Sequence, residues 1–93
     1  MELADYLQAY EEQHKKPPTQ AAVRFAAWLN DAGKKFGRIG FGDGHHHKQP
    51  LDDSIFTDWA RRYFADDTEM LELCADFVRD CYHDGLAEGQ AIA

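Results

Sequence analysis

Three consecutive histidines are the residues of this sequence whose chemistry is easiest to name. His45, His46 and His47 follow the turn sequence Gly42-Asp43-Gly44. Neutral imidazole binds divalent transition metals, and the Asp43 carboxylate could add an oxygen ligand. A solvated, histidine-rich segment without a metal is the simpler interpretation of such a run. We therefore expect no cofactor, and we keep a metal-responsive module as a second alternative function.

The two cysteines do not have the spacing of a disulfide or of a structural zinc site. Cys74 and Cys81 are seven residues apart in a segment that is predicted to be helical. Their Cα atoms would be about 10 Å apart, whereas a disulfide needs about 4.4–6.8 Å. Together with His83 they also lack the short spacing of zinc ligands. We expect two reduced thiols in the core. No nucleophile–base pairing is suggested by spacing elsewhere, so an enzyme is not expected.

Four acidic residues form the sharpest anomaly of the chain. Glu72, Asp76, Asp80 and Asp84 recur every four residues and would form one ridge along a helix. Like charges at this spacing destabilise a helix by about 0.2–0.5 kcal/mol per pair. A solubilising face is the simpler interpretation. The functional one is a surface that docks on a basic partner, to which we assign these four acids together with Asp52 and Asp53. With further acids this surface could mimic a nucleic acid.

The formal net charge of −7 is unevenly distributed, because residues 14–48 carry +5 while the segments on either side are acidic. This middle segment holds cations interleaved with aromatic residues, a combination that binds single-stranded nucleic acid. A small nucleic-acid-binding regulator that uses residues 34–48 is therefore the first alternative function. The candidate contact residues are Lys34, Lys35, Phe36, Arg38 and Phe41.

Tryptophan dominates the energetics of many protein interfaces, so both tryptophans are candidates for anchoring a partner protein. Trp28 lies between Arg24 and Asp31, on the polar side of its expected helix, and is the candidate for a half-exposed partner contact. Trp59 lies among apolar residues of another expected helix and is assigned to the core.

Hydrophobic spacing predicts four helices that would position these residues. The first ends before Pro17, and the others cover about residues 19–32, 52–65 and 68–83. Thr19 and Asp52 or Asp53 are suitable N-caps, while Gly33 and Gly85 are suitable stops. Four glycines among residues 34–50 predict a Gly/His-rich loop with at most a minimal hairpin. Residues 86–93 are expected to fray. The predicted fold is a mainly α, single-domain bundle of about four helices over residues 1–93.

Small size, acidity and the lack of a catalytic motif are typical of small regulators and inhibitors encoded by mobile elements. The leading hypothesis is a protein-binding inhibitor or regulator that occupies a basic, nucleic-acid-binding surface of its target. Direct binding of nucleic acid is the less favoured possibility. No apolar run approaches the roughly 20 residues of a membrane span, and the acidic N-terminus does not resemble a secretory signal. We expect a cytoplasmic protein.

Overall fold

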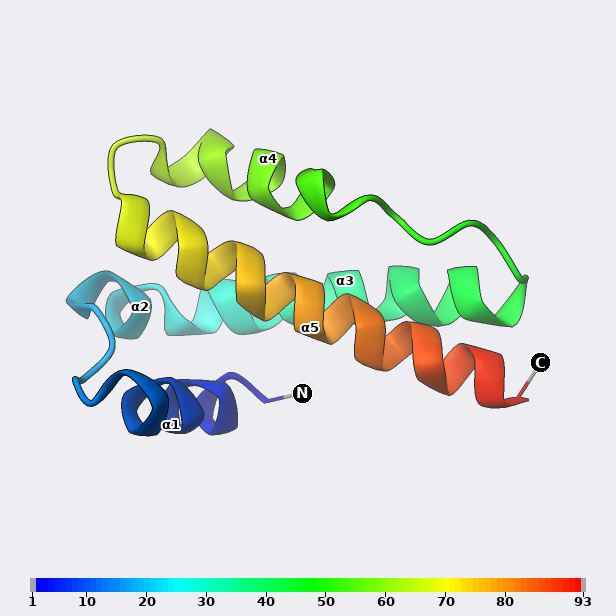
Figure 1. The fold of residues 1–93 in the computed structure, drawn as a ribbon, viewed down its shortest axis with the longest axis horizontal. Helices are drawn as coiled ribbons and strands as arrows, with labels where there is room; N and C mark the ends of the chain where they lie inside the picture. The colour runs from blue at the N-terminus through cyan, green and yellow to red at the C-terminus, as the bar shows by residue number, and fades with distance from the viewer. Residues whose placement is uncertain (1, 93) are drawn as a thin grey trace.

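The computed structural model describes residues 2–92, which form five α-helices. They are α1 (Leu3–His14), α2 (Gln20–Arg24), α3 (Ala26–His45), α4 (Asp53–Phe64) and α5 (Thr68–Ile92). α5 crosses α3, and in the view of Figure 1 it lies between α4 and α1. The described residues contain no strand, so the mainly α prediction is confirmed. The number of helices differs because α2 and α3 are separated at Phe25, within the helix expected over residues 19–32.

The predicted helix starts are confirmed by their capping bonds. Thr19 Oγ1 accepts a hydrogen bond from the backbone N–H of Ala21 at 3.0 Å, and Asp52 Oδ1 accepts one from Ser54 at 2.9 Å. Asp67 Oδ1 similarly accepts from Met70 at 3.0 Å at the start of α5. Short polar side chains at these positions satisfy amide groups that have no partner inside the helix.

The loop predicted over residues 34–50 is wrong for residues 34–45, which belong to α3. The expected stop at Gly33 is wrong as well. Glycine costs a helix about 1 kcal/mol per residue relative to alanine, but here the glycines let α3 and α5 approach backbone to backbone. A Cβ on Gly40 would overlap the carbonyl oxygen of Tyr82, and one on Gly44 would overlap that of Leu86. Packing against α5 therefore offsets the poor helix propensity.

The predicted stop at Gly85 is wrong for the same reason, as is the frayed tail over residues 86–92, while Ala93 lies outside the described residues. α5 continues to Ile92. A Cβ on Gly85 would overlap the carbonyl oxygen of Gly37, and one on Gly89 would overlap that of Phe41. The backbones of α3 and α5 are thus in close contact at glycines of both helices. A sequence reading that treated each glycine as a local helix breaker could not detect this pairing.

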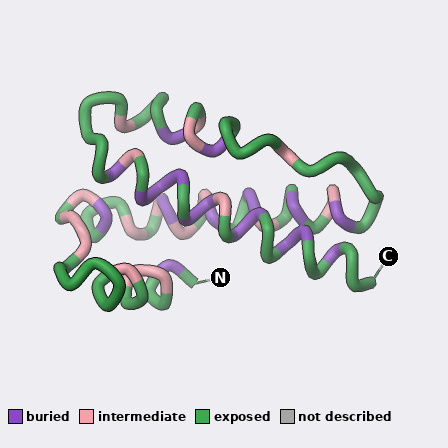
Figure 2. Tube along the Cα trace, viewed as in Figure 1, coloured by how far each residue is buried: buried purple, intermediate pink, exposed green. Residues whose placement is uncertain are grey.

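The core is built by α3, α4 and α5, and the buried residues follow α5 along most of its length (Figure 2). Cys74 and Cys81 are free and buried, as predicted. α1 contributes only Leu3 to the buried set. The largest fully buried side chains are Tyr82, Phe56, Phe77, Leu29, Met70, Val78 and Cys74.

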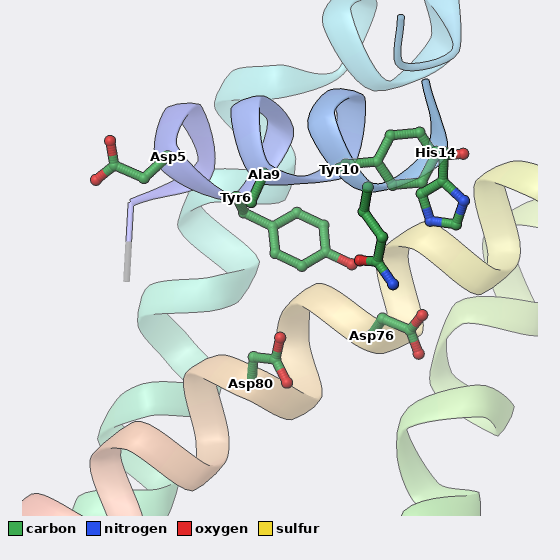
Figure 3. A pocket seen from close by; sticks show the side chains of 8 residues that line it. Asp5, Tyr6, Ala9, Tyr10, His14, Asp76 and Asp80 are labelled. Carbon is green, nitrogen blue, oxygen red and sulfur yellow. The ribbon is translucent and has the colours of Figure 1, made fainter. Parts of the chain in front are cut away.

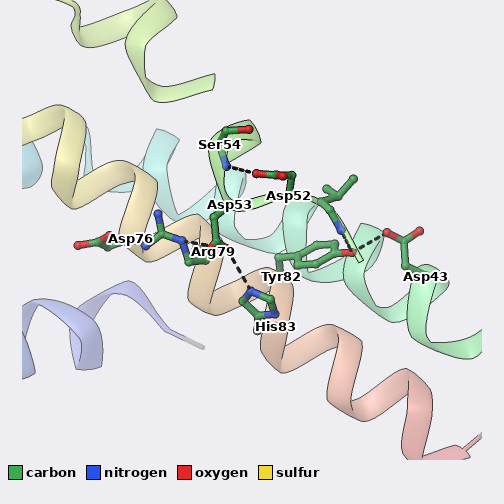
Figure 4. A network of polar contacts seen from close by, with 9 residues as sticks. Asp43, Asp52, Asp53, Ser54, Asp76, Arg79, Tyr82 and His83 are labelled. Atoms are coloured by element: carbon green, nitrogen blue, oxygen red, sulfur yellow. Dashed lines mark hydrogen bonds and ion pairs between the residues drawn. The ribbon is translucent and has the colours of Figure 1, made fainter. Parts of the chain in front are cut away.

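One buried hydroxyl holds the connection between α3 and α4 against α5. Tyr82 donates its O–H to Asp43 Oδ2 at 2.8 Å and accepts a hydrogen bond from the backbone N–H of Leu51 at 3.0 Å (Figure 4). The connection that this hydroxyl holds, between the end of α3 and the start of α4, consists of residues 46–52.

Candidate functional site

A groove between α1 and α5 brings part of the predicted acidic ridge together with residues of the N-terminal helix. It contains a cavity of about 440 Å³. In Figure 3 the Tyr6 ring points from α1 toward α5, while Asp5 and His14 lie at opposite ends of the cavity. We refer to this feature as the acidic groove. Its lining residues are Asp5, Tyr6, Ala9, Tyr10, Gln13, His14, Asp76 and Asp80.

α1 is held in place by a small number of specific contacts. The backbone N–H of Leu3 donates to Asn30 Oδ1 at 3.4 Å, and the Tyr6 ring meets the Phe77 ring edge to face at 5.3 Å. At the other end of α1, the Tyr10 hydroxyl donates to Glu69 Oε1 at 3.1 Å. Lys16 Nζ lies 3.4 Å from the same carboxylate oxygen. Both ends of α1 are therefore tied to the bundle, and the acidic groove opens between them.

The carboxylates of the acidic groove are only partly neutralised by the protein. Asp76 is paired with Arg79 at 2.7 Å, but within residues 2–92 no ion pair includes Asp5 or Asp80. Partial burial raises the pKa of Asp80 above its ordinary value, and the nearby charges of Asp76 and Asp84 raise it further. Burial and the same Asp76 and Asp80 charges raise the pKa of the Tyr6 hydroxyl. A cation placed here would relieve this repulsion.

Asp53 is connected to the ridge through a shared cation. Asp53 Oδ1 lies 3.7 Å from Arg79 Nε and 3.9 Å from His83 Nε2 (Figure 4). Arg79 therefore links Asp53 on α4 to Asp76 on α5. The neighbouring Asp52 has a capping role, because the hydrogen bonds that it accepts from Ser54 lower its pKa. Glu72 and Asp84 are exposed on α5, one turn beyond Asp76 and Asp80 respectively.

Trp28 lies in the contact between α3 and α4, whereas the acidic ridge lies on α5. Its indole stacks on that of Trp59 with ring centroids 5.6 Å apart and planes 6° from parallel. It also meets Tyr63 edge to face at 5.1 Å. Both tryptophans are half-buried. This arrangement confirms the expectation that Trp28 is half-exposed, but it places Trp28 between α3 and α4 rather than beside the α1–α5 groove.

The candidate nucleic-acid contacts are distributed around α3 instead of along a loop. Lys34, Lys35 and Arg38 are exposed on this helix. Phe36 is buried, and its ring packs against Phe56 at 5.7 Å, so it is not free to stack on a base. Phe41 is partly exposed and lies parallel to the His45 ring at 6.2 Å.

The three adjacent histidines lie at and just beyond the C-terminal end of α3. The rings of His45 and His46 are 5.1 Å apart, and His47 adopts a left-handed backbone conformation with φ of 55°. In the part of the chain that the structure describes, no group of three or more His, Cys, Asp or Glu side chains is arranged to hold a metal ion.

The sequence reading missed the contribution of α1 to the acidic groove. Tyr6 and Tyr10 are half-buried, pack against the core and also line the cavity. A signal was present in the sequence: the two tyrosines carry polar tips, and Asp5, Glu11 and Glu12 lie beside them in the same short helix.

The comparisons with known proteins place no constraint on the interpretation of these sites. No family model, no curated protein and no solved structure matches the chain. None of the helices in the described region has both the length and the apolar character that crossing a membrane requires.

Proposed function

We propose that this protein is a protein-binding module, without catalytic activity of its own, that docks its acidic groove and ridge on a basic surface of a partner. The observation that carries the proposal is the position of Asp80. It lies in a concave site between two acidic helices, its pKa is raised by partial burial and by two neighbouring carboxylates, and its described surroundings offer it no ion pair.

The lining of the acidic groove suits a cationic side chain of the partner. Carboxylates on α5 form charge-assisted hydrogen bonds with guanidinium or ammonium groups, and arginine can engage two oxygens at once. The rings of Tyr6 and Tyr10 provide aromatic walls, which attract cations through the ring quadrupole. An arginine or lysine inserted between Asp76 and Asp80 would gain both contributions and reduce the repulsion that raises the Asp80 pKa.

The exposed acids around the groove extend the same surface and favour a regulatory role. Glu72 and Asp84 continue the ridge along α5, and Asp53 joins it through Arg79. A basic surface of this size on a partner commonly binds nucleic acid, so a protein that covers it would act as an inhibitor or regulator. The charges along one helical ridge are about 6 Å apart, compared with about 1.7 Å in duplex DNA. Mimicry of a nucleic acid would therefore need Asp52, Asp53 and further acids as well as the ridge.

We also propose a cytoplasmic location. Both cysteines are free and buried, and unpaired thiols are typical of reducing compartments.

Capture of partners from an extract of the producing cells, before and after nuclease treatment, tests the proposal. Wild-type protein should retain a stoichiometric protein partner that survives nuclease. The triple variant Glu72→Gln, Asp76→Asn, Asp80→Asn should lose it. The matched control Glu12→Gln, Asp58→Asn, Asp66→Asn changes the net charge equally at exposed positions outside the groove and should retain it. Circular dichroism should give the same helix content for all three proteins.

Two results would count against the proposal. Retention of the partner by the triple variant would show that the acidic groove is not the contact surface. Bound material that disappears with nuclease, and that depends on Lys34, Lys35 and Arg38, would instead favour the nucleic-acid-binding alternative.

A further inference from the structure

A cluster of aromatic side chains from α2, α3 and α4 forms a second surface, which the acidic groove does not use. We call Val23, Phe25, Trp28, Trp59, Tyr63 and Phe64 the aromatic patch. Three of its members are among the most exposed large apolar side chains of the described protein, since Val23 is 63% exposed, Tyr63 56% and Phe25 41%. Their rings contact one another: Phe25 meets Phe64 at 5.9 Å, and Trp59 meets Tyr63 at 5.5 Å.

The aromatic patch is hollowed at two adjacent places. One hollow, of about 260 Å³, is lined by Phe25, Trp28, Tyr63 and Phe64 alone. The second, of about 220 Å³, shares Trp28 and Tyr63 as a common wall and continues along α3 to Ala32 and Lys35. Beneath them, Phe36 packs against Phe56 and Trp59. The core is therefore closed under the patch, and the hollows remain open to an inserted side chain from outside.

The charges around the aromatic patch are opposite in sign to those of the chain as a whole. Arg24 lies over the Phe25 ring, with its Cζ 5.8 Å from the centroid, and Lys35 lines the second hollow together with Asp31. Arg61 and Arg62 immediately precede Tyr63 on α4, and Arg61 is paired with Asp58. With Asp31 and Asp66 these surroundings carry a net charge of +1, whereas the chain carries −7.

We propose that the aromatic patch is a second docking surface, which binds an acidic amphipathic helix of a partner protein. Its two hollows accept large apolar anchors from one face of that helix, as in other helix-in-groove complexes. Carboxylates beside the anchors face Arg24, Lys35 and Arg62, so charge complementarity selects an acidic helix over a basic one. Base stacking is disfavoured, because Trp28 and Trp59 already cover one face of each other.

This inference is independent of the proposed function, because the acidic surface and the aromatic patch share no residue and can be disabled separately. If both are used, the protein joins two partners of opposite charge. It can also be tested without knowledge of either partner, because both tryptophans of the chain belong to the aromatic patch. Their fluorescence therefore reports binding at this surface directly.

The test is a titration of the full chain with three probes. The first is a 16-residue helical peptide that has leucine and phenylalanine at helical spacing on one face and glutamate elsewhere. The second has lysine in place of each glutamate, and the third is a 20-nucleotide oligo(dT). We expect the acidic peptide to shift the tryptophan emission and to bind at least tenfold more tightly than the lysine peptide. Equal or tighter binding of the lysine peptide at the aromatic patch, as reported by the tryptophan emission, or a shift produced only by oligo(dT), would overturn the proposal.

Two variants separate the hollows from the charges. Phe25→Ser with Tyr63→Ser removes exposed apolar walls and should weaken the acidic peptide at least tenfold, as measured by the anisotropy of a labelled peptide. Ile92→Ser, which removes an equally exposed apolar side chain from α5, should not change it. Arg24→Glu with Lys35→Glu leaves the hollows intact and should reverse the preference between the acidic and lysine peptides. Unchanged affinity in both double variants would overturn the proposal.

Discussion

The α3–α5 crossing and the α1–α5 groove use the same central helix in different ways. At the crossing, glycines of both helices bring the backbones into direct contact, and the side chains around them are buried. At the groove, tyrosines and carboxylates keep α1 at a distance, and a cavity of about 440 Å³ remains. The comparison shows a rigid part that sets the shape of the molecule and a loosely packed, charged part that is available for binding. Three predictions test this contrast.

The largest effect is expected at the crossing. Gly85→Val would force its side chain into the backbone of α3 at Gly37. Overpacking of this kind commonly costs about 1–3 kcal/mol, and here the obstacle is backbone, so we expect a loss of about 3 kcal/mol in the free energy of unfolding. Urea denaturation measures it.

Gly42→Val is the matched control, because a Cβ atom at Gly42 would meet nothing within 4 Å. Its effect should stay within about 0.5 kcal/mol, since the helix propensity of valine is only slightly better than that of glycine. If Gly85→Val and Gly42→Val lower the free energy of unfolding equally, the close approach of α3 and α5 is not what requires glycine at Gly85.

A smaller and local effect is expected where α1 is attached. Leu3 is the only buried residue of α1, and truncation of a buried leucine to alanine costs about 2–5 kcal/mol in a closed core. For Leu3→Ala we expect about 2 kcal/mol, because α1 can detach while the rest remains folded. Hydrogen exchange should accelerate in α1 and stay slow in α3 and α5, whereas the exposed-site control Gln8→Ala should change neither. Uniform acceleration throughout the chain would contradict the contrast between the two regions.

The smallest effect concerns the charge in the acidic groove. The pKa of Asp80 is raised in the folded protein, mainly by burial and then by Asp76 and Asp84. A raised folded-state pKa means that the stabilising contribution of this group is present below its unfolded pKa and is lost as the pH rises through its folded pKa. Asp80→Asn should therefore stabilise the protein slightly at neutral pH. It should also reduce the pH dependence of the free energy of unfolding just above the ordinary aspartate pKa. Thermal unfolding as a function of pH measures this, and a destabilised variant would argue against repulsion in the groove.

Features that depend on local chemistry were predictable from the sequence. Thr19 and Asp52 cap helices because a short oxygen-bearing side chain satisfies free amides wherever a helix begins, and both bonds are present. The apolar stripe of α5 identified the buried cysteines because helical periodicity places Cys74 and Cys81 in register with Phe77 and Val78. A spacing of four residues was equally sufficient to place the acids of the ridge on the outside of one helix. These acids are Glu72, Asp76, Asp80 and Asp84.

Features that depend on a partner helix were not predictable in this way. The glycines of residues 33–44 favour a loop when each is considered alone. They are accommodated in a helix because α5 packs closely against α3, with Gly40 and Gly44 against the α5 backbone and Gly85 and Gly89 against the α3 backbone. Trp28 was found on the polar side of its helix, but the aromatic patch appeared only when α4 brought Trp59 and Tyr63 beside it.

By itself, then, the sequence determined the helical class, the helix starts, the buried thiols and the acidic ridge, because these follow from residue types at short spacings along one chain segment. The tertiary structure alone decided that α3 and α5 continue through their glycines, that Asp76 and Asp80 face Tyr6 across a groove, and that the aromatic residues gather apart from the acids. These outcomes depend on contacts between residues about 30 or more positions apart, where backbone approach and burial outweigh local propensity.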